Sequence, residues 1–534
     1  MDTEVLIVGA GPVGLTLSID LGKRGIRCIL IEKNEAPLGY PKMERCNPRT
    51  MEIFRRLGLA ETVRAAGYPP DWPMDIYFVF DLMRPPLFKM AHPTVAQAKA
   101  RRDATIDGSL PLEPYQIISQ YTLEPLLKSV AERIPNVAVK FAHELLSFLE
   151  ESDGVVAQVI RKTNGETIAI RAQYMVGCDG GSSMVRKQLG FKMEGEPHLL
   201  EMRQALFHCP ELYDSVRAPR ARHYHRIDNR WTLMIVQDSR KHFTLHAVVE
   251  KDEDMATLFE TMVGTPVTYE MLYCGKWVQR RLLAEHYLQS RVFIAGDAAH
   301  LVIPTGGLGM NTGVGDAIDI SWKLAATLRG WGGPKLLQSY EAERRPIGAI
   351  NVKASGGGTA GRMKWRAAYR PNIEDDTPSG RAALANLLAI AKEEAPKTFR
   401  VVGAELGYRY ADSPVICDEP GGPAPNIKEY VPTSWPGSRL PHVWLEPGEI
   451  SVHDRIADGF TLLRVGRNKV DVSGLQRSFS AIGAPFSALD VDCEAARRVY
   501  GFDYLLVRPD LHVVWRGDAL PKDLDRLALV VTGH

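Results

Sequence analysis

The sequence has no excess of charge of either sign, because 65 Lys and Arg residues stand against 64 Asp and Glu residues in a chain of 534. Proteins that bind nucleic acid or anionic membranes through their overall field carry a marked positive excess. The sequence also lacks the run of about 18 apolar residues that a membrane-spanning helix needs. We therefore expect no nucleic-acid partner and no membrane, and a small ligand that is recognised locally.

Cysteine is scarce and scattered. The seven cysteines form no Cys-x-x-Cys pair and no zinc-like spacing, and their number is odd. The beginning, Met1-Asp2-Thr3-Glu4, is acidic where a signal peptide has a basic head. We expect reduced thiols, no metal site and a cytoplasmic location.

The N-terminal residues have the pattern of a βαβ unit. A short apolar run at 4–8 is followed by a glycine loop, a helical pattern at 13–23 and a second apolar run at 27–31. In the loop, Gly9 permits a tight turn, Gly11 lets backbone N–H groups approach a pyrophosphate, and Gly14 lets helix and strand pack closely. The loop residues that we expect at the cofactor are Gly9, Gly11, Pro12, Val13 and Gly14.

An acidic residue after the second strand indicates which nucleotide the unit binds. Glu32 closes the second strand about 20 residues beyond the loop, where a carboxylate accepts a hydrogen bond from a ribose hydroxyl. It also repels a 2′-phosphate, so FAD or NAD is favoured over NADP as the resident nucleotide. A second glycine-rich stretch, 356–361, lacks the βαβ frame and is interpreted as a flexible helix terminus.

Glycine residues follow two further predicted strands. An apolar strand delivers Asp297, which can bond a ribityl hydroxyl, and Pro304 to Asn311 then leads into a helix whose N-terminus can stabilise an anionic ring. Asp179 follows another strand, at a glycine bend. Together the three strand ends indicate one large cofactor along the edge of one sheet.

These three motifs, in this order and spacing, resemble the single-component (group A) FAD-dependent aromatic hydroxylases, the family of para-hydroxybenzoate hydroxylase and phenol hydroxylase. The resemblance covers residues 1 to about 350. It implies that Glu32 and Lys33 hold the ADP half with the glycine loop, that Arg45 lies near the isoalloxazine, and that Gln120 contacts FAD. Asp179 would serve both FAD and NAD(P)H. The residues implied along the flavin ring are Pro304, Gly307, Leu308, Gly309, Met310 and Asn311.

The resemblance implies an α/β fold with three parts. We expect a Rossmann-like FAD-binding domain at 1–72, 112–195 and 275–400, with an inserted, mainly antiparallel substrate sheet at 73–111 and 196–274. The segment 401–438 is expected as a linker. The short motifs 436–442, 506–510 and 514–516 resemble those of the thioredoxin-like C-terminal domain of the larger hydroxylases, which we expect at 439–534. Its single cysteine, Cys493, excludes dithiol chemistry, so it is expected to serve packing or to support a homodimer.

The implied reaction uses NADPH or NADH and O₂, and transfers one oxygen atom from a flavin hydroperoxide to a small phenolic aromatic substrate. Three rival functions use related scaffolds. A Baeyer–Villiger monooxygenase acting on a polyketide-type ketone stays open, as does a non-catalytic FAD- or NAD-binding sensor. A flavin-dependent halogenase is disfavoured because none of the nine tryptophans forms a Trp-x-Trp motif.

The substrate sheet carries the candidate catalytic residues. Alternation along 222–226 predicts Arg222, Tyr224 and Arg226 on one face and His223 and His225 on the other. A phenol needs a hydrogen-bond acceptor or base, for which the candidates are His225, Tyr224 and His246. The candidate substrate contacts are Arg222, Trp231 and Pro304.

Overall fold

The computed structural model describes residues 1–466 and 469–534 and contains three sheets of four or more strands. In the first, β1 (Thr3–Val8) lies between β2 (Cys28–Ile31) and β10 (Glu166–Gly177) and runs parallel to both. Such a strand is covered on both faces and must be apolar, and Val5, Leu6 and Ile7 are fully buried. The strand order is β16-β17-β10-β1-β2-β7, with β8 and β9 attached through β10. Its other strands are β7 (Val137–Lys140), β8 (His143–Glu150), β9 (Val155–Arg161), β16 (Leu288–Gln289) and β17 (Val292–Ile294).

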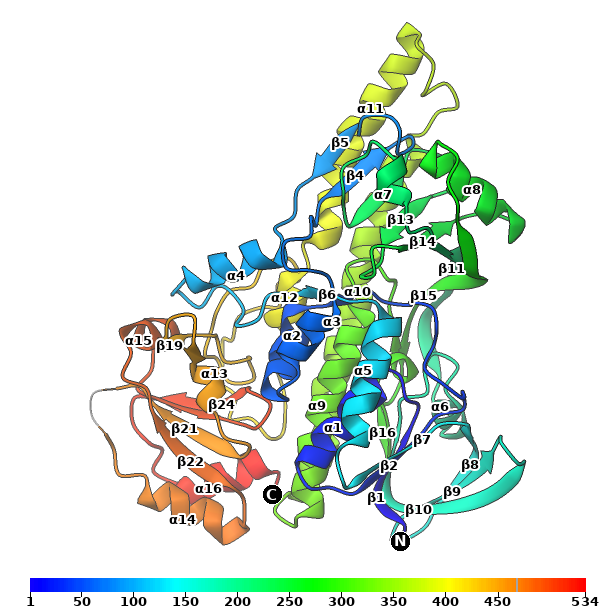
Figure 1. The fold of residues 1–534 in the computed structure, drawn as a ribbon. Coiled ribbons are helices and arrows are strands. Elements are labelled where there is room, and N and C mark those ends of the chain that lie inside the picture. The colour runs from blue at the N-terminus through cyan, green and yellow to red at the C-terminus, as the bar shows by residue number, and fades with distance from the viewer. Residues whose placement is uncertain (467–468) are drawn as a thin grey trace.

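Three helices build the layer beside this sheet. Helix α1 (Pro12–Lys23) packs against α5 (Gln120–Glu132) and α9 (Gly309–Leu328) (Figure 1). Proline at the first position of α1 is suited to a helix start, because its missing N–H has no partner there in any case. The same arrangement leaves the N-termini of α1 and α9 at the carboxyl ends of the parallel strands, where nucleotides bind.

The second sheet has eight strands in the order β18-β15-β11-β14-β13-β12-β4-β5, and all neighbours are antiparallel except β12 and β4. This confirms the inserted, mainly antiparallel substrate sheet. It extends beyond the expected limits at both ends of 196–274. Its strands are β4 (Ile76–Val79), β5 (Phe88–Met90), β11 (Met193–His208), β12 (His223–Arg226), β13 (Leu233–Val236), β14 (His242–Ala247), β15 (Glu270–Ala284) and β18 (His300–Leu301).

The two faces of this sheet meet different partners. One face packs in a single apolar cluster with α7 (Leu212–Ser215) and α8 (Glu253–Val263). The other packs against the end of α10 (Pro334–Ala367) and against α11 (Pro378–Glu394). Helix α10 is therefore shared, because its first half packs on α9 in the FAD-binding part (Figure 1).

The glycine-rich stretch 356–361 lies inside α10, so its interpretation as a helix terminus is wrong. A β-carbon at Gly358 would lie 2.7 Å from Thr305 Cγ2, and one at Gly356 would overlap the Arg281 guanidinium. These glycines let the helix approach its neighbours closely, which outweighs their cost of roughly 1 kcal/mol each in a helix interior.

The C-terminal domain contains a four-stranded sheet in the order β22-β21-β23-β24, with one parallel and two antiparallel pairs, and confirms the thioredoxin-like fold. Its strands are β21 (Phe460–Arg464), β22 (Phe486–Asp490), β23 (Tyr504–Val507) and β24 (Val513–Gly517), and its longer helices are α14 (Ser473–Ile482), α15 (Glu494–Tyr500) and α16 (Leu524–Thr532). Arg439 binds Glu52 of α2 (Pro48–Arg56) through two hydrogen bonds, and both side chains are fully buried. The domain is thus docked on the FAD-binding part (Figure 1).

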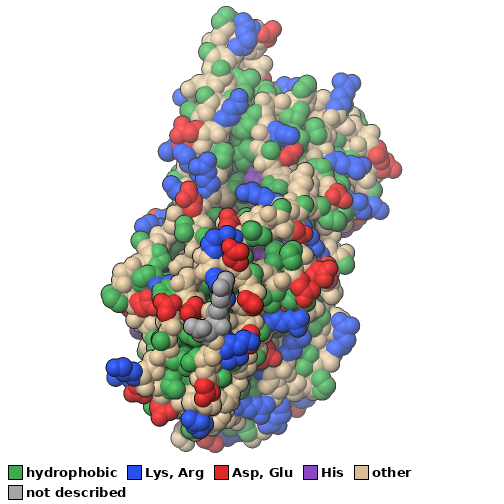
Figure 2. All heavy atoms as spheres, turned by 90° about the vertical axis from the view of Figure 1, so that its left-hand side faces the viewer, with side chains coloured by type: hydrophobic (Ala, Val, Ile, Leu, Met, Phe, Trp, Pro, Cys, Tyr) green, Lys and Arg blue, Asp and Glu red, His purple; other side chains and the backbone are tan. Residues whose placement is uncertain are grey.

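Shorter elements complete the chain. They are β3 (Arg45–Cys46), β6 (Gln116–Ile117), β19 (Trp444–Glu446), β20 (Ile450–Ser451), α2 (Pro48–Arg56), α3 (Ala60–Ala66), α4 (Val95–Asp103), α6 (Met184–Gln188), α12 (Val402–Leu406), α13 (Val452–Arg455) and the 3₁₀ turns Gly296–Ala298 and Ala395–Phe399. Within the described residues, none of the helices combines the length and apolarity of a membrane span. Acidic and basic side chains are interspersed on the face that Figure 2 shows, as the balanced composition predicts.

Candidate flavin and substrate site

The structure packs the glycine loop against the strand end that carries Asp179. Gly9 has φ +106°, and a β-carbon there would overlap the carbonyl oxygen of Cys178, next to Asp179. A β-carbon on Gly14 would overlap the Gly9 carbonyl and lie 3.3 Å from Cys178 Cβ. Both positions therefore need glycine, one for its conformation and both for close approach.

The motif that carries Asp297 packs against the same glycine loop. A β-carbon on Gly313 of α9 would lie 2.5 Å from Val13 Cγ2 and 2.9 Å from Gly296 Cα. Asp297 follows Gly296, and its Oδ1 lies 4.0 Å from where a Gly309 β-carbon would be. The three motifs thus form one continuous edge at the N-termini of α1 and α9.

Acidic and amide side chains brace this edge. Glu32 accepts hydrogen bonds from the backbone N–H groups of Ala10 and Asn34, both at 2.9 Å. Gln120 accepts a bond from Lys42 N and donates to Glu124, whose Oε1 lies 4.0 Å from where a Gly11 β-carbon would be. Lys33 is exposed beside this group.

Two carboxylates have the surroundings that a bound polar cofactor requires. The Asp297 side chain is solvent-accessible, yet burial among the protein atoms around it raises its pKa. Both observations follow if Asp297 lines a recess. Asp179 uses Oδ2 to cap α6, accepting bonds from Met184 N and Val185 N, whereas its buried Oδ1 has no protein partner. The residues present therefore fit FAD along this edge.

Arg45 marks the far end of the edge. It donates to the carbonyl of Gly306 at 3.1 Å and forms a short ion pair with Glu405. Asn311 joins the loop 304–309 to β3, because its amide donates to the carbonyls of Arg45 and Gly307. The loop 304–309, in which Pro304 is exposed, is thus held against β3.

The sequence interpretation missed two parts of this region. Glu405 lies on α12, inside the segment 401–438 that we expected as a linker. Asp316 of α9 accepts bonds from Gly296 N and His300 and forms a buried ion pair with Arg344. Asp316 stands seven residues after Gly309 and so on the same side of α9, a periodicity that could have signalled its role.

On the substrate sheet, side chains from five strands form one row. The register pairs Gln204 with His246, His246 with Leu233, Leu233 with His225, and His225 with Phe78. Paired residues project from the same face of a sheet, so His225 and His246 share the face that α10 covers. The two sequence-predicted histidines therefore lie on one face, two strands apart, with Leu233 between them.

Tyr224 is placed elsewhere, contrary to its prediction as a catalytic candidate. Its hydroxyl donates to the carbonyl of Pro219 at 2.6 Å and contacts the hydroxyl of Tyr213. It belongs to the apolar cluster on the α8 side of the sheet. The structure therefore excludes Tyr224 from the face that carries the histidines.

Arg222 joins that face although alternation predicted the opposite one. Its guanidinium and His223 Nε2 both bind Glu44 Oε1, at 2.5 and 2.7 Å. Arg222 lies just outside β12, where strand alternation does not apply. Trp231 has its ring 5.6 Å from the guanidinium carbon of Arg366.

The electrostatics of the face keep its histidines neutral. Burial, reinforced by Arg362, lowers the pKa of His246 to about 4 and holds that of His225 well below its usual value. Burial would raise the pKa of Glu44, but Arg222 and His223 outweigh it and lower it. Neutral imidazoles can then accept or donate one hydrogen bond each.

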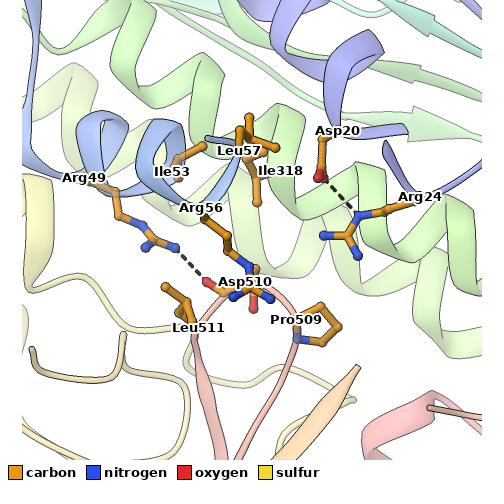
Figure 3. A pocket seen from close by; sticks show the side chains of 10 residues that line it. All are labelled: Asp20, Arg24, Arg49, Ile53, Arg56, Leu57, Ile318, Pro509, Asp510 and Leu511. Carbon is orange, nitrogen blue, oxygen red and sulfur yellow. Dashed lines mark hydrogen bonds and ion pairs between the residues drawn. The ribbon is translucent and has the colours of Figure 1, made fainter. Parts of the chain in front are cut away.

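Two hollows lie among the described residues, and neither is lined by His225 or His246. The pocket in Figure 3 lies between α1, α2 and the loop around Asp510, and its volume of about 20 Å³ holds little more than one water molecule. There Arg49 donates to the Asp510 carbonyl at 2.7 Å. A hollow of about 260 Å³ lies at the edge strand β5, beside His92.

Comparison with known proteins agrees with this geometry. Residues 2–355 match the model of the FAD binding domain, and 433–533 match that of the aromatic-ring hydroxylase C-terminal domain. An FAD-dependent monooxygenase, apdD, from Emericella nidulans is 31% identical over 99% of this chain and 90% of its own length. Phenol 2-monooxygenase from a Pseudomonas species is 30% identical over 98% of this chain and 91% of its own.

Solved structures are similar over the whole chain. RebC, soaked with chromopyrrolic acid and holding 7-carboxy-K252c, superposes with a TM-score of 0.91 at 33% identity, covering 99% of both chains. Aklavinone-11 hydroxylase, in complex with FAD and aklavinone, gives 0.83 at 27%, covering 100% of this chain and 99% of its own.

Fold and site together define a flavin-dependent oxidoreductase. The chain belongs to the family of single-component FAD-dependent aromatic hydroxylases, as the three motifs indicated. It is an FAD-dependent monooxygenase of the aromatic and polyketide hydroxylase type. This membership favours an enzyme over a non-catalytic sensor.

Proposed function

We propose that this enzyme uses NADPH or NADH and O₂ to hydroxylate a phenolic aromatic substrate held between the loop 304–309, called the flavin loop below, and the α10 face of the substrate sheet. The observation that carries the proposal is the register-paired row with His225 and His246, whose Nδ1 atoms are buried without a protein partner. When bound, FAD supplies hydride acceptance and the activation of oxygen.

The residues of the face can orient a phenol. Phe78 and Trp365, both almost fully buried, lie 5.3 Å apart in an edge-to-face arrangement and contact His225, so they hold its imidazole ring in place. A neutral imidazole can accept a hydrogen bond from the phenol O–H. Because the pKa of both histidines lies far below 7, they are suited to orienting the hydroxyl rather than to carrying its proton as a stable cation.

Other residues keep the reacting region closed. Asn311 and Arg45 hold the loop 304–309 in place, and α10 covers the face of the sheet. A closed site excludes water from a reactive reduced cofactor, which limits unproductive loss of reducing equivalents. We infer that Pro304 and Trp231 line the substrate region, and that the remaining flavin-site residues act as the family resemblance implies.

The experiment is a substrate panel with the FAD-loaded enzyme. We expect a phenol to accelerate NADPH or NADH oxidation and to yield a product with one additional oxygen atom. Product mass cannot distinguish hydroxylation from Baeyer–Villiger insertion, since both add one oxygen. Carbon NMR separates them, because insertion converts a ketone carbonyl into an ester and hydroxylation leaves every carbonyl unchanged. If phenols neither accelerate oxidation nor gain oxygen while ketones do, the proposal is wrong.

A further inference from the structure

One side of α10 connects the flavin loop to the substrate sheet. Near the loop, Thr359 Oγ1 lies 3.1 Å from Thr305 Oγ1. Near the sheet, Trp365 contacts His225, and Arg366 binds Asp228 at 3.2 Å. Residues three or four apart share a side of a helix, so Arg362 lies between these two contact points, about one turn from each.

Arg362 differs from other arginines near the flavin loop and the substrate sheet. Arg45 pairs with Glu405, Arg222 with Glu44, and both Arg226 and Arg366 pair with Asp228. In the parts of the chain that the structure describes, no hydrogen bond or ion pair joins Arg362 to any group. Its side chain is only partly exposed, and burial without a compensating carboxylate lowers its pKa to about 10.

The groups that Arg362 faces are also unsatisfied. Its charge acts on His223, His225 and His246, lowering the pKa of all three. The buried Nδ1 atoms of His225 and His246 have no protein partner, nor has the indole nitrogen of Trp277, which lies against His246. Buried polar atoms without partners are rare in folded proteins unless a ligand or water satisfies them.

We propose that Arg362 binds a carboxylate of the substrate, so that the enzyme acts on aromatic acids. This inference rests on the proposed hydroxylase function and names its substrate class. A guanidinium offers a planar pair of N–H donors that matches a carboxylate. Arg362 presents one such pair, which no acidic side chain of the described residues binds, and the neutral imidazoles near it can donate to the same oxygens.

The position of Arg362 favours a carboxylate over the reacting phenolic oxygen. Arg362 lies about one helical turn beyond the contact with the flavin loop, towards the sheet. A carboxylate held there leaves the ring between Arg362 and the loop, where oxygen is transferred. A carboxylate is also charged at neutral pH, whereas a phenol with an ordinary pKa is not.

The test compares binding of matched acids and esters. Hydroxylated aromatic acids with one, two and three rings, and the methyl ester of each, are titrated into the oxidised holoenzyme without a reductant, following the flavin absorbance. We expect at least one acid to bind about 10- to 100-fold more tightly than its ester. Arg362→Gln should abolish that preference while changing ester binding by less than about threefold, and Arg362→Lys should restore part of it.

Lys353→Gln is the matched control. Lys353 is an exposed cation on α10, nine residues before Arg362 and therefore on the opposite side of the helix. This variant should keep the preference for acids. The inference is overturned if no acid binds more tightly than its ester, or if Arg362→Gln keeps the preference.

Product analysis separates this failure from failure of the proposed function. Oxygenation of the esters with no preference for the acids would overturn the carboxylate site and leave the hydroxylase function standing. Binding of acids that depends on Arg362, without oxygenation of any panel member, would support the site and contradict the phenol hydroxylase.

Discussion

Arg508 of the C-terminal domain and Glu343 of α10 form a two-pronged ion pair, in which each carboxylate oxygen lies 2.7 Å from a guanidinium nitrogen. Both side chains are completely buried. Lys323 of α9 binds the same carboxylate at 2.7 Å. Helix α10 also carries Arg344, whose partner Asp316 supports Gly296 at the flavin edge. The C-terminal domain is therefore part of the structure that holds the FAD-binding core.

Arg508→Met should destabilise the protein by about 3–5 kcal/mol, because it leaves Glu343 and Asp510 buried without their guanidinium partner. The free energy of unfolding in denaturant measures the change. Arg161→Met is the control, since the Arg161–Glu166 pair is exposed and its loss should cost less than about 1 kcal/mol. Equal stability of the two variants would contradict a buried network.

Gly9→Ala should release FAD. Gly9 has φ +106° and touches the Cys178 carbonyl, so a β-carbon shifts the loop at the cofactor edge. We expect the purified variant to carry less than about one tenth of the wild-type flavin, measured by absorbance. Gly165→Ala separates strain from crowding, because Gly165 has φ +72° but no atom within 4 Å of the β-carbon position. That control should cost about 1 kcal/mol of stability and keep its FAD.

Acidification should destabilise the fold through buried neutral histidines. The pKa of His246 falls from 6.5 to about 4 on folding, so between these values the unfolded chain binds a proton that the folded chain does not. Stability is therefore lost as the pH falls through this window, by roughly 2 kcal/mol per such histidine between pH 7 and 5.

Unfolding of His246→Phe at pH 7 and pH 5 tests this sign. The variant should lose less stability over that interval than the wild type. The same replacement at the exposed His198 should leave the pH dependence as it was. A steeper dependence in His246→Phe would show that the sign is wrong.

Tyr224→Phe should lower the stability of the protein but not its activity, and His225→Gln should lower its activity. Tyr224 faces the α8 side, so its variant should lose about 1 kcal/mol of stability for one buried hydrogen bond, with kcat/KM changed less than about twofold. His225 lies on the α10 face of the substrate sheet, where we propose that the substrate binds, so its variant should lose about 10- to 100-fold in kcat/KM for a phenol. Steady-state kinetics on the same substrate distinguishes them. Loss of activity in Tyr224→Phe alone would reverse the assignment.

The FAD-binding core could be predicted because its signals are local. The tight turn at Gly9 and the acid at Glu32 are properties of one βαβ unit, and the βαβ geometry dictates where they lie relative to each other. The thioredoxin-like domain was recognised by resemblance, from short motifs. The limits of the substrate sheet were less exact, because β11 and β15 continue past the points where the alternating pattern ends.

The arrangement of residues on the α10 face of the substrate sheet could not be predicted, because it is made of contacts between distant segments. His225 and His246 share a face only through the register of β12, β13 and β14, in which Leu233 stands between them. Alternation did place Tyr224 opposite His225, but which face packs against α8 and which against α10 is decided by tertiary packing. Glu44 and Glu405 come from segments without any motif. A pairing of this kind depends on how sheets and helices pack, which no local pattern of residues specifies.

The sequence by itself determined the cofactor class and the position of the glycine loop, since a backbone turn and a nearby carboxylate act within one short unit. Tertiary structure alone decided which charges are paired. Arg508 pairs with Glu343 across a domain interface, whereas Arg362 is placed between the flavin loop and the histidines and pairs with no acid of the residues that the structure describes. Pairing depends on distance and burial, and these are set only when the three parts pack together.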